Sequence, residues 1–595
     1  MNTLQRTIAR MAQFLADTLA ALTGLYYSKK YAAIVKRLGL AGPGEAADGR
    51  RGFIIIQIDG LSHEALQAAL EAGIMPHTRK MLERGHLRLS RWRCGLPSTT
   101  PAAQAGILFG NNEDIPGYRW YDKRRRTPVV AKSPNDMGEV QARLSASRPG
   151  ILQGGLSSGN VFDGDASVSL STLGAINERR LFESVRGLGF LMLFLLNPWR
   201  ALRMGFLSVR EYVVAALERI KARFRLGRPV PLVDLHPWVR VFSNVILSEL
   251  QTFAVQIDIY RGTPAIYSTY YGYDETAHHH EVSSTAARRS LRDIDAHIHQ
   301  IDRLRRARLN RDYDLYILSD HGLTPAHPFA WLYGETLGQF IARQIGKPMR
   351  LAETDDGENQ AGVHAQYLLE ELRAIEANLG ERGAIIAHAL YRLAEKRLTQ
   401  PGDQTTRHVD RANDIVVRNS GSLSHVYFNV TDAQMELSQV MEVFPELIPR
   451  LVLHEGIWLV AGREGNEVVV IGKEGILRLG VGYRVHGQNP LRLLPEPEWA
   501  ADQIRRLLFF PHSGDLIVFG HYDPATNTVV SFEEQWAAHG GLGGPQDYPF
   551  IMYPDRVQWD FEGVRNAEEL YGYFASRYGI AEPLAMSIAT PIPAT

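Results

Sequence analysis

Aspartate and histidine residues follow several short apolar segments of this sequence, at positions where a metal ion could be bound. Asp274 and His278 stand four residues apart, just after the aromatic run YSTYY. A carboxylate and an imidazole at that spacing lie on one face of a helix, as half of a zinc site requires. The same pair also fits an ordinary solvated helix face, so its meaning depends on the segments around it.

Three other segments place such residues next to glycine. FIIIQIDG ends in Asp59, DYDLYILSDHG ends in Asp320 and His321, and a late segment carries His539 before two glycines. The first two segments are short, continuous and rich in β-branched or aromatic residues, which is typical of strands buried in a parallel sheet. We therefore expect these side chains at the C-terminal ends of neighbouring strands, where open α/β sheets bind their ligands.

Two adjacent hydroxyl groups precede a predicted helix. Thr99 and Thr100 stand before Pro101, and the following residues, AAQAGILFG, are good helix formers. Proline suits the first turn of a helix. A hydroxyl at a helix N-terminus lies near free backbone N–H groups and a positive dipole end, which favours a nucleophile that attacks phosphorus. The alternative is an N-cap residue without a chemical role.

Composition limits the classes of protein and of metal site. The 595 residues are 45% hydrophobic and 22% charged, as in ordinary globular proteins, and basic and acidic residues number 65 each. Zero formal net charge favours no specific nucleic-acid partner. Cys94 is the single cysteine, so neither an internal disulfide nor a thiolate cluster can form, and any metal must be held by histidine and carboxylate.

The pattern along the chain predicts a core interrupted by insertions. Amphipathic N-terminal helices are either surface helices or, alternatively, a secretory signal. The run between Arg186 and Arg200 has 13 uncharged residues, too few to span a bilayer, so it is either a cap helix or a segment that lies on a membrane surface. The predicted divisions are N-terminal helices and linker (1–50), a first core part (51–334, with a cap insertion at about 122–250), a helical insertion (335–405), a second core part (406–560) and a peripheral tail (561–595).

The order of these motifs resembles the alkaline phosphatase superfamily and, within it, the nucleotide pyrophosphatase/phosphodiesterase (type I phosphodiesterase) family. IIQIDG, STTPAAQAGILFG, YDETAH, LSDHG and AAHGG are similar to that family's metal and nucleophile segments, in the same order. The resemblance covers about residues 53–330 and 505–555. It implies an α/β fold, an alkaline phosphatase-like three-layer sandwich with a mostly parallel central sheet and helical cap insertions.

The resemblance also implies a ligand set and a nucleophile. One metal would be held by Asp274, His278 and His539. The second would be held by Asp59, Asp320, His321 and the Thr99 oxygen, because the family's Thr-x-Pro pattern selects Thr99 over Thr100. Two divalent ions are expected; histidine and carboxylate ligands suit zinc and permit manganese or iron. The strand-interior His425 is an alternative late ligand in place of His539.

The nucleophile segment bears on the substrate. Where sulfatases of this superfamily carry an arginine two residues after proline, this sequence has Ala102 and Ala103 after Pro101. Without that cation, a phosphodiester or a pyrophosphate-linked nucleotide is favoured over a dianionic monoester. The family's phosphate-binding asparagine has no clear match, and Asn111 and Tyr118 are the substrate-binding candidates.

The resulting hypothesis is a metal-dependent phosphodiesterase or nucleotide pyrophosphatase that acts through a phosphothreonine intermediate. The alternatives are a phosphomonoesterase, a phosphonate hydrolase, or a lipid head-group phosphodiesterase or transferase with the same metal pair. A binding or scaffold protein with a degenerate site is a third class, which the full ligand set disfavours. A cytoplasmic or peripherally membrane-associated location is expected, with export left open.

Overall fold

A mostly parallel sheet forms the centre of the computed structural model, which describes residues 50–175, 202–214, 216, 241–307, 310–346, 349–354 and 413–580. Within these residues the sheet has seven strands. Strands β8, β1, β7, β5 and β6 pair in parallel, and β21 and β2 add an antiparallel edge. In spatial order the strands are β2 (Leu87–Arg91), β21 (Phe550–Pro554), β8 (Tyr313–Leu318), β1 (Gly52–Ile58), β7 (Ala265–Tyr270), β5 (Leu156–Ser158) and β6 (Val168–Leu170).

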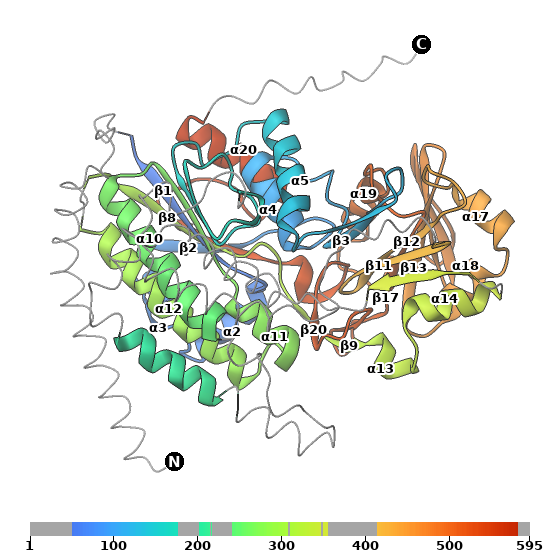
Figure 1. Ribbon diagram of the computed structural model, residues 1–595, viewed down its shortest axis with the longest axis horizontal. Coiled ribbons are helices and arrows are strands. Elements are labelled where there is room, and N and C mark those ends of the chain that lie inside the picture. Colours follow the sequence, from blue (N-terminus) through green and yellow to red (C-terminus); the bar gives the residue numbers. More distant parts are fainter. Residues whose placement is uncertain are drawn as a thin grey trace, which may run out of the picture.

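Strand β1 is buried on both faces, because its alternate side chains enter two different helical layers. Ile54, Ile56 and Ile58 pack in a core that includes residues of α2, α3, α10, α11 and α12. Phe53 and Ile55 pack in a second core with α4, α5 and α20. Figure 1 shows the two groups of helices on opposite sides of the sheet. The helices are α2 (His63–Glu71), α3 (Pro76–Glu83), α10 (Ser248–Arg261), α11 (Gly272–His280), α12 (Thr285–Arg305), α4 (Thr100–Phe109), α5 (Pro134–Ser147) and α20 (Ala567–Tyr578).

This arrangement confirms the predicted three-layer α/β class with a mostly parallel central sheet. The continuous apolar run of β1 was the sequence signal for it, since only a strand covered on both faces tolerates such a run.

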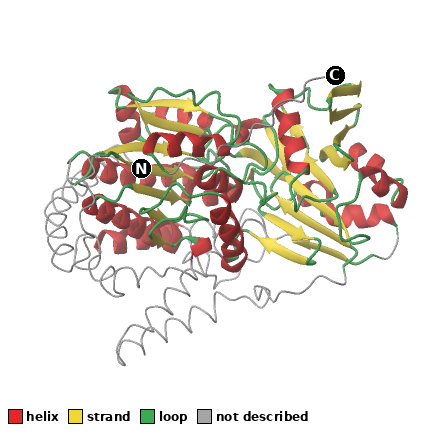
Figure 2. Ribbon diagram, turned by 90° about the horizontal axis from the view of Figure 1, so that it is seen from above, coloured by secondary structure: helices red, strands yellow, loops and turns green. Residues whose placement is uncertain are grey.

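A second sheet, largely antiparallel, lies beside the first, as Figure 2 shows. Most of the predicted second core part belongs to it rather than to the central sheet. Its strands are β10 (Leu351–Thr354), β11 (Ile415–Ser420), β12 (Leu423–Phe428), β17 (Leu516–Gly520), β13 (Ile457–Glu464), β14 (Glu467–Gly472), β15 (Gly475–Gly480) and β16 (Gly482–Gly487). The accompanying helices are α13 (Phe329–Tyr333), α14 (Leu337–Ile345), α17 (Leu437–Val443), α18 (Leu447–Leu453) and α19 (Pro497–Leu508).

A small sheet is formed by short segments that follow strands of the two large sheets. Strand β9 (Thr324–Pro328), which follows β8, pairs with β19 (Thr528–Ser531) and with β20 (Ala537–Ala538). β18 (Tyr522–Asp523) completes this sheet, and β3 (Arg119–Asp122) with β4 (Thr127–Val130) forms a separate hairpin. The small sheet brings the segment before His539 next to the segment after His321.

Two predicted boundaries differ from the structure. The expected cap at 122–250 contributes β5 and β6 to the central sheet itself, because those strands are too short to read from the sequence. The expected peripheral tail at 561–595 contains α20, which packs against α4 and buries Leu570, Tyr571 and Phe574. Its apolar residues recur at helical spacing, a signal that the prediction overlooked.

Several predicted segments lie outside the described residues. These are the N-terminal helices before residue 50, the apolar run at 187–199, most of the helical insertion and the last residues of the tail. Within the described residues, no helix combines the length and apolar character needed to cross a membrane.

Candidate metal centre

The C-terminal ends of three parallel strands bring the predicted ligands together. Asp59 directly follows β1, and Asp320 and His321 follow β8. Strand β7 leads into α11, whose first turn carries Asp274. Gly60 permits this convergence: its φ is +69°, and a Cβ there would lie 2.3 Å from Asp274 Oδ1. A side chain at this position would therefore push the two carboxylates apart.

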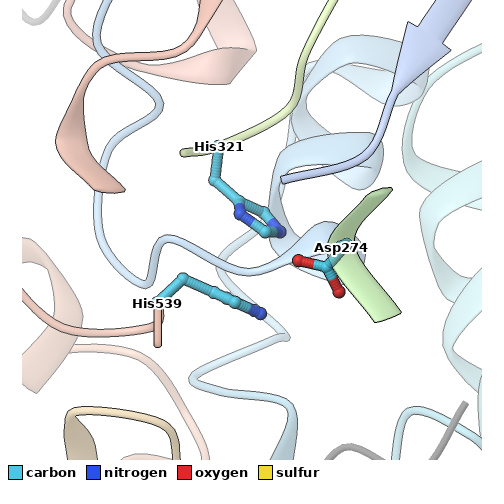
Figure 3. Close-up of side chains that lie close together, drawn as sticks. All are labelled: Asp274, His321 and His539. Atoms are coloured by element: carbon cyan, nitrogen blue, oxygen red, sulfur yellow. The ribbon is translucent and has the colours of Figure 1, made fainter. Parts of the chain in front are cut away.

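Two overlapping groups of buried ligand atoms result. Asp59, Asp320 and His321 form one group, and Asp274, His321 and His539 form the other, with the ligand atoms of each group within 4.8 Å of one another. Figure 3 shows the side chains of the second group converging from three separate segments. His321 thus belongs to both groups, whereas the sequence assigned it to one. His278 lies beside the second group, with Nε2 3.0 Å from Asp274 Oδ2.

Backbone carbonyls orient three of the histidine rings. The Nδ1 atoms of His278, His321 and His539 lie 2.6, 3.0 and 2.8 Å from the carbonyl oxygens of Ala537, Gly322 and Ser98. A carbonyl only accepts, so each Nδ1 carries a proton, and a ring that is neutral keeps its lone pair on Nε2. This arrangement is the usual one for histidine ligands, whose second nitrogen donates to a fixed acceptor.

Electrostatics favour the forms that bind a metal. Burial alone would raise the pKa of Asp274, but the positive charge of a protonated His278 and the hydrogen bond from its ring outweigh burial and lower that pKa, so the carboxylate stays ionised. Burial lowers the pKa of His321, which keeps its ring neutral. A neutral imidazole beside ionised carboxylates is the donor set that divalent cations require.

His539 is held by the hairpin turn between β11 and β12. Ser422 N–H donates to His539 O at 3.1 Å. Gly421 lies against the same carbonyl, with a φ of +61°, and a Cβ there would lie 2.0 Å from His539 O. From the other side, Ser98 O accepts from Gly540 N–H at 3.0 Å. This support was not predicted from the sequence, although a Ser-Gly-Ser turn between two strand-like segments is a hairpin signal.

The two threonine hydroxyls have different surroundings. Thr100 Oγ1 lies 3.2 Å from Asp59 Oδ1 and 3.1 Å from His321 Nε2. Thr99 is the N-cap of α4, but its side chain makes no capping bond. Its Oγ1 is buried and has no hydrogen-bond partner in the described part of the chain. Thr100 is therefore a second hydroxyl close to the candidate ligands, although the family resemblance selects Thr99 as the nucleophile.

The remaining candidates make contacts outside the two ligand groups. Asn111 is at the far end of α4 from Thr99, where its side chain accepts from Glu113 N–H. Tyr118 N–H donates to Ser420 Oγ, which places this residue against the β11–β12 turn. His425 is held on both sides, with Nε2 2.8 Å from Pro116 O and Nδ1 accepting from Gly514 N–H. Its pKa falls to about 4 through burial. It is a core residue, and His539 occupies the late position in the cluster.

An α/β sheet with two overlapping carboxylate–histidine groups and hydroxyls at its C-terminal edge indicates a metal-dependent hydrolase. A family model described as Type I phosphodiesterase / nucleotide pyrophosphatase matches residues 53–427, well over half of the chain. The chain therefore belongs to the type I phosphodiesterase/nucleotide pyrophosphatase family, whose members are metal-dependent phosphoester hydrolases. His539 lies beyond the matched range, whereas the other predicted ligands fall within it.

Two solved structures are also similar to this chain. Both are of phosphonoacetate hydrolase from Sinorhizobium meliloti 1021, one with phosphonoformate and one with phosphonoacetate. The identities are 16% and 15%, with TM-scores of 0.42 and 0.41, and each match covers 89% of this chain and 96% of the other. No curated protein matches the chain.

Proposed function

We propose that this chain hydrolyses phosphodiester or pyrophosphate bonds at a two-metal site, through a covalent phosphothreonine intermediate. The observation that carries the proposal is the pair of buried ligand groups that share His321 and lie beside the N-terminus of α4. Two cation positions next to a hydroxyl are what in-line displacement at phosphorus needs.

The residues present fit two divalent cations. Asp274, His278 and His539 would hold one of them, and Asp59, Asp320 and His321 with a threonine oxygen would hold the other. Zinc is preferred, because the ligands are imidazoles and carboxylates in compact sets. Buried oxygens such as Asp320 Oδ2, which has no hydrogen-bond donor among the described residues, are costly unless a cation compensates them. When bound, the pair would neutralise phosphoryl oxygens and lower the pKa of the attacking hydroxyl.

Thr99 is the proposed nucleophile. Its Oγ1 is buried and engaged in no hydrogen bond among the described residues, a state that costs about 1–3 kcal/mol. Thr100 Oγ1 is instead within bonding distance of Asp59 and His321, which suits a positioning role. Attack by the Thr99 oxygen would form its bond to phosphorus while the bond to the leaving group breaks, and the departing alkoxide or phosphate would take up the proton that the hydroxyl loses. Water would then cleave the phosphothreonine from the opposite side.

The surroundings of α4 favour a substrate with a single negative charge. Ala102 and Ala103 are buried in the first turns of the helix, so these positions offer no cation to a second negative charge. The N–H groups and the dipole of the α4 N-terminus supply a modest positive potential. A phosphodiester or a pyrophosphate linkage matches this better than a phosphomonoester.

Hydrolysis of bis-p-nitrophenyl phosphate and p-nitrophenyl phosphate, with and without a chelator, tests the proposal. We expect the diester to be preferred, and the activity to disappear on chelation and return with zinc. Thr99→Ala should lose about 1,000-fold or more, and Thr100→Ala about tenfold. Acid quenching followed by mass spectrometry should find phosphate on Thr99. Phosphate on Thr100 would exchange the two roles, and a monoester preference would refute the diesterase assignment.

A further inference from the structure

In the helix formed by residues 202–214, the apolar side chains face outward and the charged side chains face the protein. Its most exposed side chains are Leu202, Phe206 and Val209, at 65%, 72% and 64%, and Val213 continues the series at 47%. These residues recur at intervals of three and four, so they form a single stripe along one face. Within residues 202–214 every exposed residue is apolar, glycine or Tyr212.

The charged side chains of the same helix face the protein. Arg203 pairs with Glu249 of α10 at 3.3 Å, and Arg210 pairs with Asp293 of α12 at 2.6 Å. Glu211, the only acidic residue within 202–214, is buried. Figure 1 shows this helix, blue-green and unlabelled, at the edge of the molecule below α3. The ion pairs therefore fix the orientation of the helix, with its apolar stripe turned outward.

An ordinary surface helix shows the opposite arrangement, with its apolar face buried and its charges in water. A contiguous apolar stripe that is held outward by ion pairs marks a contact surface. The stripe continues a strongly apolar part of the sequence, since the 13 residues before Arg200 carry no charge. After the helix in the sequence, residues 217–228 are basic, with one acidic residue, Glu218, against Arg219, Lys221, Arg223, Arg225 and Arg228.

We propose that the helix at 202–214 docks the chain on an anionic bilayer surface, with the stripe of Leu202, Phe206, Val209 and Val213 inserted among the lipids. Apolar side chains next to a basic segment are the combination that peripheral membrane proteins use, because burial and attraction to anionic lipids add together. Glu211 is buried, so no carboxylate within residues 202–214 opposes this contact. The inference is independent of the proposed enzymatic activity.

Flotation with vesicles tests the proposal on the full chain. Vesicles of phosphatidylcholine with 30% phosphatidylglycerol should carry the protein upward, and pure phosphatidylcholine should carry much less. Phe206→Ser with Val209→Ser should weaken binding about 30-fold or more, because two inserted side chains are lost. The matched control is Leu453→Ser with Val481→Ser, which also changes two exposed apolar residues, on α18 and next to β16, and it should leave binding unchanged.

A second measurement locates the contact. Brominated lipids should quench the additional tryptophan fluorescence of Phe206→Trp but not that of Val481→Trp. Each variant is compared with the parent chain. The proposal is overturned if the Phe206 and Val209 changes leave binding to anionic vesicles unaltered, or if the full chain does not float. It is also overturned if light scattering shows a dimer that these changes abolish, because the apolar stripe would then contact a second copy of the chain. If the Phe206 and Val209 changes lower the thermal stability strongly and leave flotation unaltered, another segment of the same chain packs on the apolar stripe.

Discussion

Replacing Gly421 with alanine should displace His539 without touching any ligand side chain. Gly421 sits at the β11–β12 turn with a φ of +61°. An added Cβ would lie 2.0 Å from His539 O, whereas an ordinary carbon–oxygen contact is about 3.4 Å. The carbonyl and the backbone of His539 must therefore retreat by about 1.4 Å, or the turn must move away by the same amount.

The size of the effect follows from two terms. The left-handed conformation alone costs an L-residue about 1–2 kcal/mol. The displacement acts on the site in addition, because a misplacement of about 1 Å can reduce turnover by about 100-fold. Loss of a supporting contact to a ligand typically weakens metal binding by about 10–100-fold.

Gly465→Ala is the matched control. Gly465 has a φ of +58°, and a Cβ there would meet nothing within 4 Å, so it carries the conformational cost alone. Both variants are compared by thermal unfolding, by zinc competition with a chelating dye and by diester hydrolysis. We expect Gly465→Ala to lose about 1–2 kcal/mol of stability and Gly421→Ala to lose more, because its Cβ also meets His539 O. Zinc affinity and kcat/KM should fall in Gly421→Ala only. Equal zinc affinity and equal kcat/KM in the two variants would refute the view that this turn holds His539.

Two further predictions concern buried charges. Burial raises the pKa of Asp547 from 3.8 to about 7. The unfolded chain therefore loses this proton first as the pH rises, and the free energy of unfolding should fall by about 3 kcal/mol between pH 4 and 7. Asp547→Asn should remove that decline in urea titrations, and an unchanged slope would contradict it. Arg119→Met should cost about 3–5 kcal/mol in the same assay, because Glu533 would lose its buried partner. Arg88→Met, which breaks an exposed pair, should change little; equal losses would refute the distinction.

Most of the candidate ligands were recognisable in the sequence, because they follow strands whose apolar runs are easy to recognise. Asp59, Asp320 and His321 come directly after such runs, and a parallel sheet gathers their ends at one edge. His539 was harder, since it follows a two-residue strand and depends on a hairpin more than 100 residues earlier in the chain. The sharing of His321 between two groups depends on side-chain positions that no spacing in the sequence encodes.

The second sheet could not be located in the same way. Some of its strands are continuous apolar runs, such as β13 and β17, and others mix apolar and polar residues. Such patterns predict strands but do not say which sheet the strands join. Residues 156–158 and 168–170 pose the opposite problem: they belong to the central sheet but are only three residues long. Such strands are held by their neighbours and not by their own pattern. The order of strands in a sheet is a tertiary property that local periodicity does not determine.

The two halves of the candidate centre are supported by different parts of the fold. Asp59, Asp320 and His321 stand at the ends of two paired strands of the central sheet. Asp274 and His278 stand on α11, and the His278 ring and backbone are bound by the segment around β20, through Ala537 O and Trp536 N–H. That same segment ends in His539, which the β11–β12 turn holds in place. The second sheet therefore does more than extend the molecule: its β11–β12 turn, together with β20 of the small sheet, positions His539, a candidate ligand that no strand of the central sheet carries.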